Sequence, residues 1–321
     1  MSVLAQMLRP LALTLSALAL LAACDTVAPT LKPQARPPGL DRSAPQPDGT
    51  TRSTQSQALS RYYARVQSEL LSQGLMRGDG GGADTPFDAE DLARNFEIIA
   101  FFDEHARGAL TPSDGRPGKL HRWESPVRMK ADFAPGVSQD ISKRDNAIIS
   151  RYAARLGRVT GHPVGVTRST SANFHILVGG VDDEDYILRR VREIAPDISA
   201  STLGIFRNLP RSIHCFVLAF PGADNGDVYK LAIAYVRAEH PDFLRRACYH
   251  EELAQGLGLA NDSARARPSI FNDDDEFALL TRLDELLLKI LYDRRLRSGM
   301  GLEEARPVIR RIAAELLPET S

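Results

Sequence analysis

Apolar residues recur every three or four positions in several stretches of the chain, and this spacing places them along one side of an α-helix. The spacing predicts helices over residues 55–76, 88–105, 145–158, 183–194, 242–257 and 277–293. Shorter runs in which apolar residues alternate or follow one another predict strands over residues 122–133, 164–166, 174–178, 213–220 and 231–236. These elements predict an α+β domain built around one mixed β-sheet, and about 220 residues are enough for a single core.

The segments on either side of the predicted domain, residues 84–305, have different patterns. Residues 24–54 contain six prolines and few large apolar groups, which predicts a flexible tether. Residues 55–83 combine the first predicted helix with a glycine run that is typical of a hinge. The apolar stripe of that helix fits either packing against a core or binding to a partner. Residues 306–321 are predicted to form a C-terminal tail helix.

The first 23 residues are largely apolar and nearly uncharged. They contain one basic residue, Arg9, and an apolar run from Leu11 to Ala23 that is too short to span a bilayer. The run ends in Leu-Ala-Ala-Cys, which resembles a bacterial lipobox, so we expect Cys24 to be acylated and to anchor a lipoprotein that faces the periplasm. The alternative is an ordinary signal peptide with a chance cysteine. Asp25 favours the inner membrane by the rule for enteric bacteria.

The charge of the chain is nearly balanced. The 40 Lys and Arg residues against 41 Asp and Glu residues give a net charge of −1, and loss of Arg9 with the signal makes it about −2. Proteins that bind nucleic acids concentrate positive charge against the phosphates, so this composition argues against a nucleic-acid partner. The expected partners are a membrane, through the lipid anchor, and a peptide or envelope protein.

The chain has three cysteines, and lipid attachment at Cys24 leaves two for other roles. Cys215 lies in a predicted strand and Cys248 lies in the predicted helix 242–257. An oxidising compartment permits a disulfide between them, which would fasten the helix to the sheet. Two buried free thiols are the alternative.

Residues 251–262 read Glu-Glu-Leu-Ala-Gln-Gly-Leu-Gly-Leu-Ala-Asn-Asp. This resembles the metzincin zinc-protease helix His-Glu-x-x-His-x-x-Gly-x-x-His, with Gly258 as the glycine at which the chain turns back. The catalytic base then falls on Glu252, and the three zinc-ligand positions hold Glu251, Gln255 and Asn261. The rival register begins at His250, but it places alanine at the second ligand position and leucine at the turn.

Two later segments extend this resemblance. Ser269-Ile-Phe-Asn is similar to the Ser-Ile-Met turn below the metal of metzincins, with Phe271 in the place of the methionine. The predicted helix 277–293 is similar to the helix that closes those domains at the C-terminus. The resemblance implies a zincin-like sheet, an active-site-type helix and a closing helix.

The same residues resemble more closely a proteobacterial envelope family known as domain of unknown function 2927. The matching features are Cys248, the segment 251–263 and the segment 269–273. The resemblance extends over residues 84–305 and implies no established activity. It also implies that the absence of the zinc-binding histidines belongs to the family pattern.

The chemistry of the motif residues favours a structural role over a catalytic one. One carboxylate and two amides form a poor zinc site, so Glu251, Gln255, Asn261 and Asp262 fit a hydrogen-bonded network better than a weak site for a hard cation. Glu252 without a metal-activated water has no electrophile to act on. We therefore expect neither a metal nor a cofactor, and we interpret His250 as a surface or core-edge histidine, with an added metal ligand as the alternative. The acidic run 272–276 is interpreted as the N-terminus of a helix instead of a calcium loop.

Two functional classes remain. The first is a noncatalytic envelope lipoprotein whose zincin-like cleft binds a peptide or protein partner, for example by adding a strand to the sheet edge. The second is an atypical metallopeptidase or peptidoglycan-peptide hydrolase with Glu252 as its general base. The missing imidazoles favour the first class.

Overall fold

A computed structural model describes residues 52–103, 113–222 and 225–318 of the chain. The chain divides into two units, Met1–Pro47 and Asp48–Ser321, and the described residues belong to the second. The predicted signal peptide, the predicted acylation site at Cys24 and nearly all of the predicted tether lie outside the described residues. None of the described helices combines the length and apolar character that crossing a bilayer requires.

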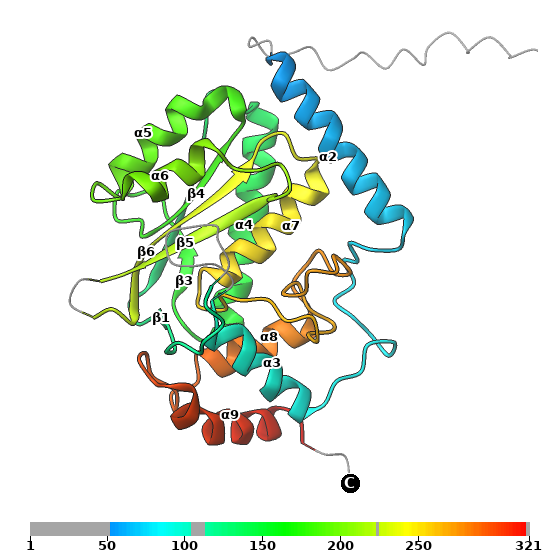
Figure 1. Ribbon diagram of the computed structural model, residues 1–321, viewed down its shortest axis with the longest axis vertical. Helices are drawn as coiled ribbons and strands as arrows, with labels where there is room; N and C mark the ends of the chain where they lie inside the picture. The colour runs from blue at the N-terminus through cyan, green and yellow to red at the C-terminus, as the bar shows by residue number, and fades with distance from the viewer. Residues whose placement is uncertain (1–51, 104–112, 223–224, 319–321) are drawn as a thin grey trace, which may run out of the picture. The chain divides into compact units, whose positions relative to one another are not determined.

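One sheet forms the centre of the described unit (Figure 1). Four parallel strands lie in the order β3, β2, β4, β6, the two-residue strand β1 pairs with the start of β6, and β5 adds an antiparallel edge strand to β6. The bounds are β1 Arg122–Trp123, β2 Val127–Phe133, β3 Val164–Val166, β4 Phe174–Gly179, β5 Cys215–Pro221 and β6 Val228–Arg237. The central strand β4 is buried throughout, as its largely apolar sequence, in which only His175 is polar, predicts.

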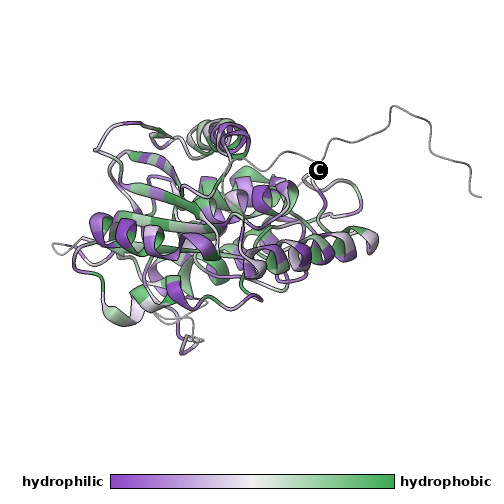
Figure 2. Ribbon diagram, turned by 90° about the horizontal axis from the view of Figure 1, so that it is seen from above, coloured by the Kyte–Doolittle hydropathy of each residue, from purple (hydrophilic) through white to green (hydrophobic). Residues whose placement is uncertain are grey.

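Helices cover both faces of the sheet (Figure 1). The helix α4 and the motif helix α7 lie on one face with α3, α8 and α9 in a large apolar cluster, and α5 and α6 lie on the other. Figure 2 shows that the strands are mainly hydrophobic. On the helices, hydrophobic and hydrophilic residues alternate. The bounds are α2 Thr54–Ser72, α3 Ala89–Phe101, α4 Gln139–Thr160, α5 Glu184–Ile194, α6 Ala200–Arg207, α7 Asp242–Gln255, α8 Arg282–Leu291 and α9 Leu302–Leu316, with a short 3-10 helix, η1, at Val181–Asp183.

The predicted mixed sheet with helices around it is confirmed at this level. Because the sheet is mainly parallel and helices cover both of its faces, the arrangement is closer to α/β than to the predicted α+β class. Helix α6 was not predicted. Helix α8 begins at Arg282 instead of residue 277, because the side chains of Thr281 and Asp284 form a capping box at that point. The finer zincin-like assignment stays a prediction.

Helix α2 packs against α7 and against the residues just before it through both apolar and polar contacts. The buried ring of Tyr63 lies edge-on to His240, with 4.4 Å between ring centroids. The side chain of Ser56 donates a hydrogen bond to Glu239, and Gln67 accepts one from the backbone of Leu244, both at 3.0 Å. The apolar stripe of this helix is therefore occupied by packing within the same unit.

Candidate functional site

A cleft of about 670 Å³ lies between helix α7 and the edge strand β5. One wall is a helical stripe of α7, with residues at steps of three and four that share one face: Leu244, Ala247, Cys248, Glu251, Glu252 and Gln255. The second wall is the consecutive run 212–221, which comprises β5 and the three residues before it. Residues of the loop 270–278 form a third wall. The cleft is thus placed at the meeting point of the motif helix, an edge strand and the Ser-Ile-Phe turn.

A buried ion pair holds α7 in position against α4. Arg245 on α7 and Asp145 on α4 are 1% and 2% exposed in their side chains, with 2.5 Å between Nε and Oδ2. The same Asp145 oxygen accepts a hydrogen bond from the Tyr249 hydroxyl at 2.8 Å, and Arg245 also donates to the His240 carbonyl. Burial lowers the pKa of the Arg245 guanidinium, but the hydrogen bond and charge of Asp145 outweigh this and raise it overall. Arg245 is therefore a cation whose charge is balanced inside the core.

His250 is buried among packed side chains instead of lying at the surface or core edge as predicted, and it fixes the loop that forms the third wall. Its ring stacks on Tyr152 with 4.0 Å between centroids, and its Nδ1 accepts a hydrogen bond from the Leu280 backbone at 3.0 Å. Burial, with smaller effects from Arg246 and Arg155, lowers the pKa of His250 to about 3. The imidazole is consequently neutral at pH 7, which its role as a hydrogen-bond acceptor requires.

The Ser-Ile-Phe turn is anchored by a buried carboxylate of α8. Asp284 accepts hydrogen bonds from the Ser269 hydroxyl at 2.5 Å and from the Ile270 backbone at 3.2 Å. It also accepts from the backbone and hydroxyl of Thr281, both at 2.8 Å. Burial raises the pKa of Asp284 although these bonds oppose the rise. The turn and the start of α8 are thus one hydrogen-bonded unit, and Phe271 of the turn is fully buried.

Two positions at the end of α7 are glycine because a side chain there would collide with neighbouring residues. The Gly256 carbonyl accepts a hydrogen bond from Trp123 Nε1 at 2.8 Å, and a Cβ on Gly256 would lie 2.5 Å from the Phe174 ring. Gly258 has φ +130°, and a Cβ there would lie 2.3 Å from the His121 carbonyl oxygen. Such a φ disfavours every other residue type. Gly258 is therefore the point at which the chain turns back after the helix, as the motif predicts.

The register of the sheet shows which backbone groups of β6 face β5. The backbone of Ala232 donates to Asn173, and that of Ala238 donates to Gly179. Even-numbered residues of β6 therefore turn their N–H and C=O groups toward β4, and odd-numbered residues turn theirs toward β5, because the direction alternates along a strand.

The same register leaves one set of β5 backbone groups on the outer edge of the sheet. Phe216 and Leu218 stand opposite the odd-numbered residues Tyr235 and Ile233, so they form the hydrogen-bonded pairs. Cys215, Val217 and Ala219 stand opposite even-numbered residues, so their N–H and C=O groups face outward. No second strand among the described residues pairs with β5 on that side. This outer edge borders the cleft, whose lining includes every residue of β5.

The predicted disulfide between Cys215 and Cys248 is confirmed, with 5.9 Å between the two Cα atoms. It joins the first residue of β5 to the middle of α7. The bond therefore connects the two principal walls of the cleft near one end. The free-thiol alternative is wrong.

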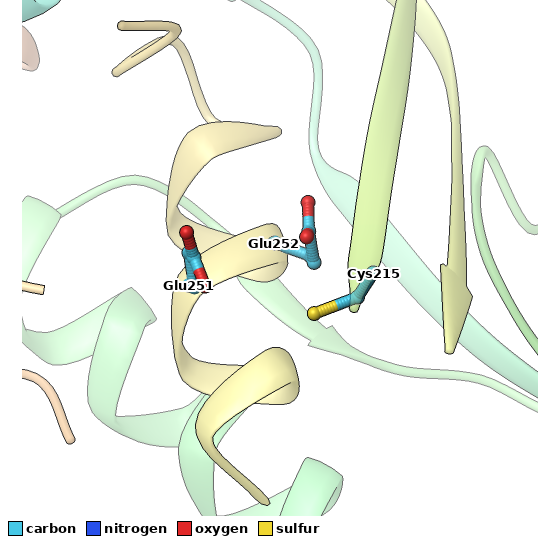
Figure 3. Close-up of side chains that lie close together, drawn as sticks. All are labelled: Cys215, Glu251 and Glu252. Carbon is cyan, nitrogen blue, oxygen red and sulfur yellow. The ribbon is translucent and has the colours of Figure 1, made fainter. Parts of the chain in front are cut away.

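The structure brings four of the five predicted motif residues into the cleft. Glu251, Glu252, Gln255 and Asp262 line it, and Figure 3 shows Glu252 on the side of α7 that faces Cys215. Asn261 instead donates from its side chain to the Ile98 carbonyl at 3.2 Å, beside α3. The residue at the third zinc-ligand position of the metzincin pattern therefore bonds to the C-terminal part of α3.

The donor groups that lie together do not fit zinc. Oxygens of Glu251 and Glu252 and the sulfur of Cys215 lie within 4.8 Å of one another. The Cys215 sulfur is bonded to Cys248 and offers no thiolate, so two carboxylates remain. Zinc sites use three or four protein ligands, most of which are His nitrogens or Cys sulfurs. Zinc-dependent hydrolysis with Glu252 as base therefore lacks its ligand set among the described residues.

The acidic run 272–276 does not begin a helix, so that interpretation is wrong. Its backbone forms turns closed by its own side chains, with Asp274 bonded to Asn272 and Glu276 to Asp274. Asp273 and Asp275 line the cleft, a role that the sequence analysis did not assign. Burial raises the pKa of the Asp275 carboxyl, the His214 ring opposes the rise, and Asp274 and Asp273 add to it.

The fold and the cleft define a mixed α/β domain in which a helix and an edge strand line a cleft of about 670 Å³. The model of one protein family, described as protein of unknown function (DUF2927), matches residues 89–311. The match covers more than half of the chain, and the chain belongs to this family. No curated protein and no solved structure matches the chain.

Proposed function

We propose that this protein is a noncatalytic envelope lipoprotein that binds an extended peptide segment in the cleft between α7 and β5. The observation that carries the proposal is the outward row of backbone N–H and C=O groups at Cys215, Val217 and Ala219. An extended peptide pairs with such a row as an additional strand, and its side chains enter pockets beside the strand. The wall of α7 supplies those pockets.

Two features of the chain support the envelope location. The segment Leu-Ala-Ala-Cys at residues 21–24 has the lipobox pattern, which makes Cys24 the proposed acylated residue. The disulfide between Cys215 and Cys248 is the kind of bond that persists in an oxidising compartment. The zincin-like interpretation belongs to this proposal as well, because the motif helix and the Ser-Ile-Phe turn line one cleft and α8 anchors that turn.

A proline at the outer edge of β5 tests the proposal. The probe is a library of acetylated and amidated random heptapeptides, screened against the soluble form, which is the chain from residue 24 onward with Cys24→Ser. Val217→Pro removes one outward N–H, and proline is tolerated where that group points away from the sheet. We expect the variant to weaken binding of the selected heptapeptides about tenfold or more, the cost of leaving a peptide carbonyl unpaired.

The matched control is Val217→Thr, which keeps the backbone N–H and nearly the same side-chain shape. We expect Val217→Thr to bind the heptapeptides as the parent does and both variants to unfold at similar temperatures. Equal binding by Val217→Pro and Val217→Thr would contradict pairing along β5. Cleavage of the heptapeptides, lost in Glu252→Gln, would favour the hydrolase instead.

A further inference from the structure

One end of the cleft is apolar and is formed by three separate parts of the chain. Met76 from the segment after α2, Leu244 and Ala247 from the first half of α7, and Ala278 from the loop of the third wall all line the cleft. The same four residues belong to the apolar cluster between α2, α7 and this loop. Ala247 is half-buried and the other three are buried. These four residues are the apolar end of the cleft.

Backbone hydrogen bonds hold Met76 at the cleft. Its N–H donates to the Asp275 carbonyl at 2.7 Å, and the N–H of Arg77 donates to the Glu276 carbonyl at 2.7 Å. Met76 has φ 56°, a left-handed conformation that is uncommon for residues other than glycine. A backbone in this conformation persists only where the surrounding structure fixes it, and such residues cluster at ligand-binding sites. The fold therefore places this apolar side chain at the cleft against the local preference of the backbone.

The edge strand β5 runs along the second half of α7. It begins at the disulfide with the middle of the helix, and Figure 3 shows the end of β5 that carries Cys215 beside α7. At the other end of β5, Pro221 stands opposite Tyr229, whose ring stacks on His121. The His121 carbonyl lies against Gly258, just after α7. The first half of α7, and with it the apolar end of the cleft, therefore lies beyond the first residue of β5.

The spacing along α7 matches the spacing of side chains in an extended peptide. Leu244 precedes Cys248 by one helical turn, which is about 6 Å of α7. Two residues of a strand extend about 6.6 Å, and their side chains point to the same face. The side chains of Cys215 and Val217 lie on the α7 side of the sheet. A peptide that pairs with β5 and continues past Cys215 therefore brings its next α7-facing side chain to the apolar end.

We propose that the apolar end of the cleft is a subsite for one large apolar side chain of the bound peptide, such as leucine, isoleucine, methionine or phenylalanine. The proposal rests on the proposed peptide-binding function and adds the chemical class of the residue that anchors the ligand. Met76 is the specificity-determining wall, because its unbranched thioether side chain adapts to apolar partners of different shape. The anchor also sets the register of the peptide on β5, because a slip of one residue turns its side chain to the other face.

Alanine scanning of the tightest-binding heptapeptide of the library tests the proposal in the soluble form. We expect alanine at one large apolar position to weaken binding about tenfold or more, because the truncation removes buried apolar surface. Ala247→Leu places a larger side chain in the subsite and should weaken binding of the unsubstituted heptapeptide to a similar degree. The same variant should change the affinity for the alanine-substituted heptapeptide little, because two changes that act on one contact are not additive.

The matched control is Ala154→Leu, which makes the same change at an exposed position of α4 outside the cleft lining. It should bind both heptapeptides as the parent does, and urea unfolding shows whether each variant is folded. A parent in which no large apolar position of the heptapeptide is sensitive to alanine would overturn the subsite, whatever the variants do. Equal weakening of both heptapeptides by a folded Ala247→Leu would also overturn it, while the effect of Val217→Pro keeps peptide binding along β5. Failure of every library peptide to bind would overturn the proposed function itself.

Discussion

Replacing Asp145 by alanine is expected to lower the free energy of unfolding by about 3–5 kcal/mol, because the change leaves the Arg245 charge buried without its partner. The Tyr249 hydroxyl loses its acceptor at the same time. The ion pair connects α4 to α7, so the loss also loosens one wall of the cleft. Urea unfolding of the soluble form, followed by circular dichroism, measures the change.

An exposed ion pair of the same two helices provides the control. Arg144 on α4 bonds to Asp242 on α7 at 2.8 Å, but the two side chains are 47% and 58% exposed. Arg144→Ala is therefore expected to lower the free energy of unfolding by about 0–1 kcal/mol. The free energy of unfolding of Asp145→Asn should lie between those of these two variants, because asparagine keeps a hydrogen-bond acceptor but not the charge. Similar unfolding midpoints for Asp145→Ala and Arg144→Ala would contradict the assigned role of the buried pair.

Loss of the disulfide is the second change with a large expected effect. The bond closes a loop with a sequence separation of 33 residues, for which restriction of the unfolded chain gives about 3–4 kcal/mol of stability. The double variant Cys215→Ala and Cys248→Ala should therefore unfold at a markedly lower urea concentration than the parent. Because the bond joins β5 to α7, the variant should also bind the selected heptapeptides more weakly.

Reduction of the parent with dithiothreitol is a second way to break the disulfide, without any mutation. Treatment should move the parent's midpoint toward that of the double variant and leave the double variant unchanged. The denatured parent should show no free thiol before reduction and about two afterwards. An unchanged midpoint on reduction, or two reactive thiols before it, would contradict the structural role of the bond.

The sequence predicts the elements of the cleft because each has a local signal. The stripe on α7 follows helical spacing, Gly258 marks the turn, and the apolar run around Cys215 indicates a strand. The disulfide follows from the small number of cysteines. Helix α6 was missed because it has only eight residues and contains Gly204, which weakens the helical signal.

The properties that give the cleft its proposed function depend on contacts between distant residues. That β5 lies at the edge of the sheet follows from the strand order, which pairs it with β6 alone among the described strands. Asp145 and Arg245 are separated by 100 positions, so no local pattern links them. Asn261 has the spacing of a third ligand, yet the turn after Gly258 brings it to α3. The acidic run lines the cleft because its loop is fastened to α7 and α8.

Amide hydrogen exchange of the soluble form, with and without the tightest-binding heptapeptide of the library, tests the central claim most directly. The amides of Val217 and Ala219 face the outer edge, whereas those of Phe216 and Leu218 already bond to β6. Peptide pairing along β5 predicts that exchange at Val217 and Ala219 slows strongly on binding, while Phe216 and Leu218 are slow in both states. A bound peptide that leaves exchange at Val217 and Ala219 unchanged would contradict strand addition at this edge.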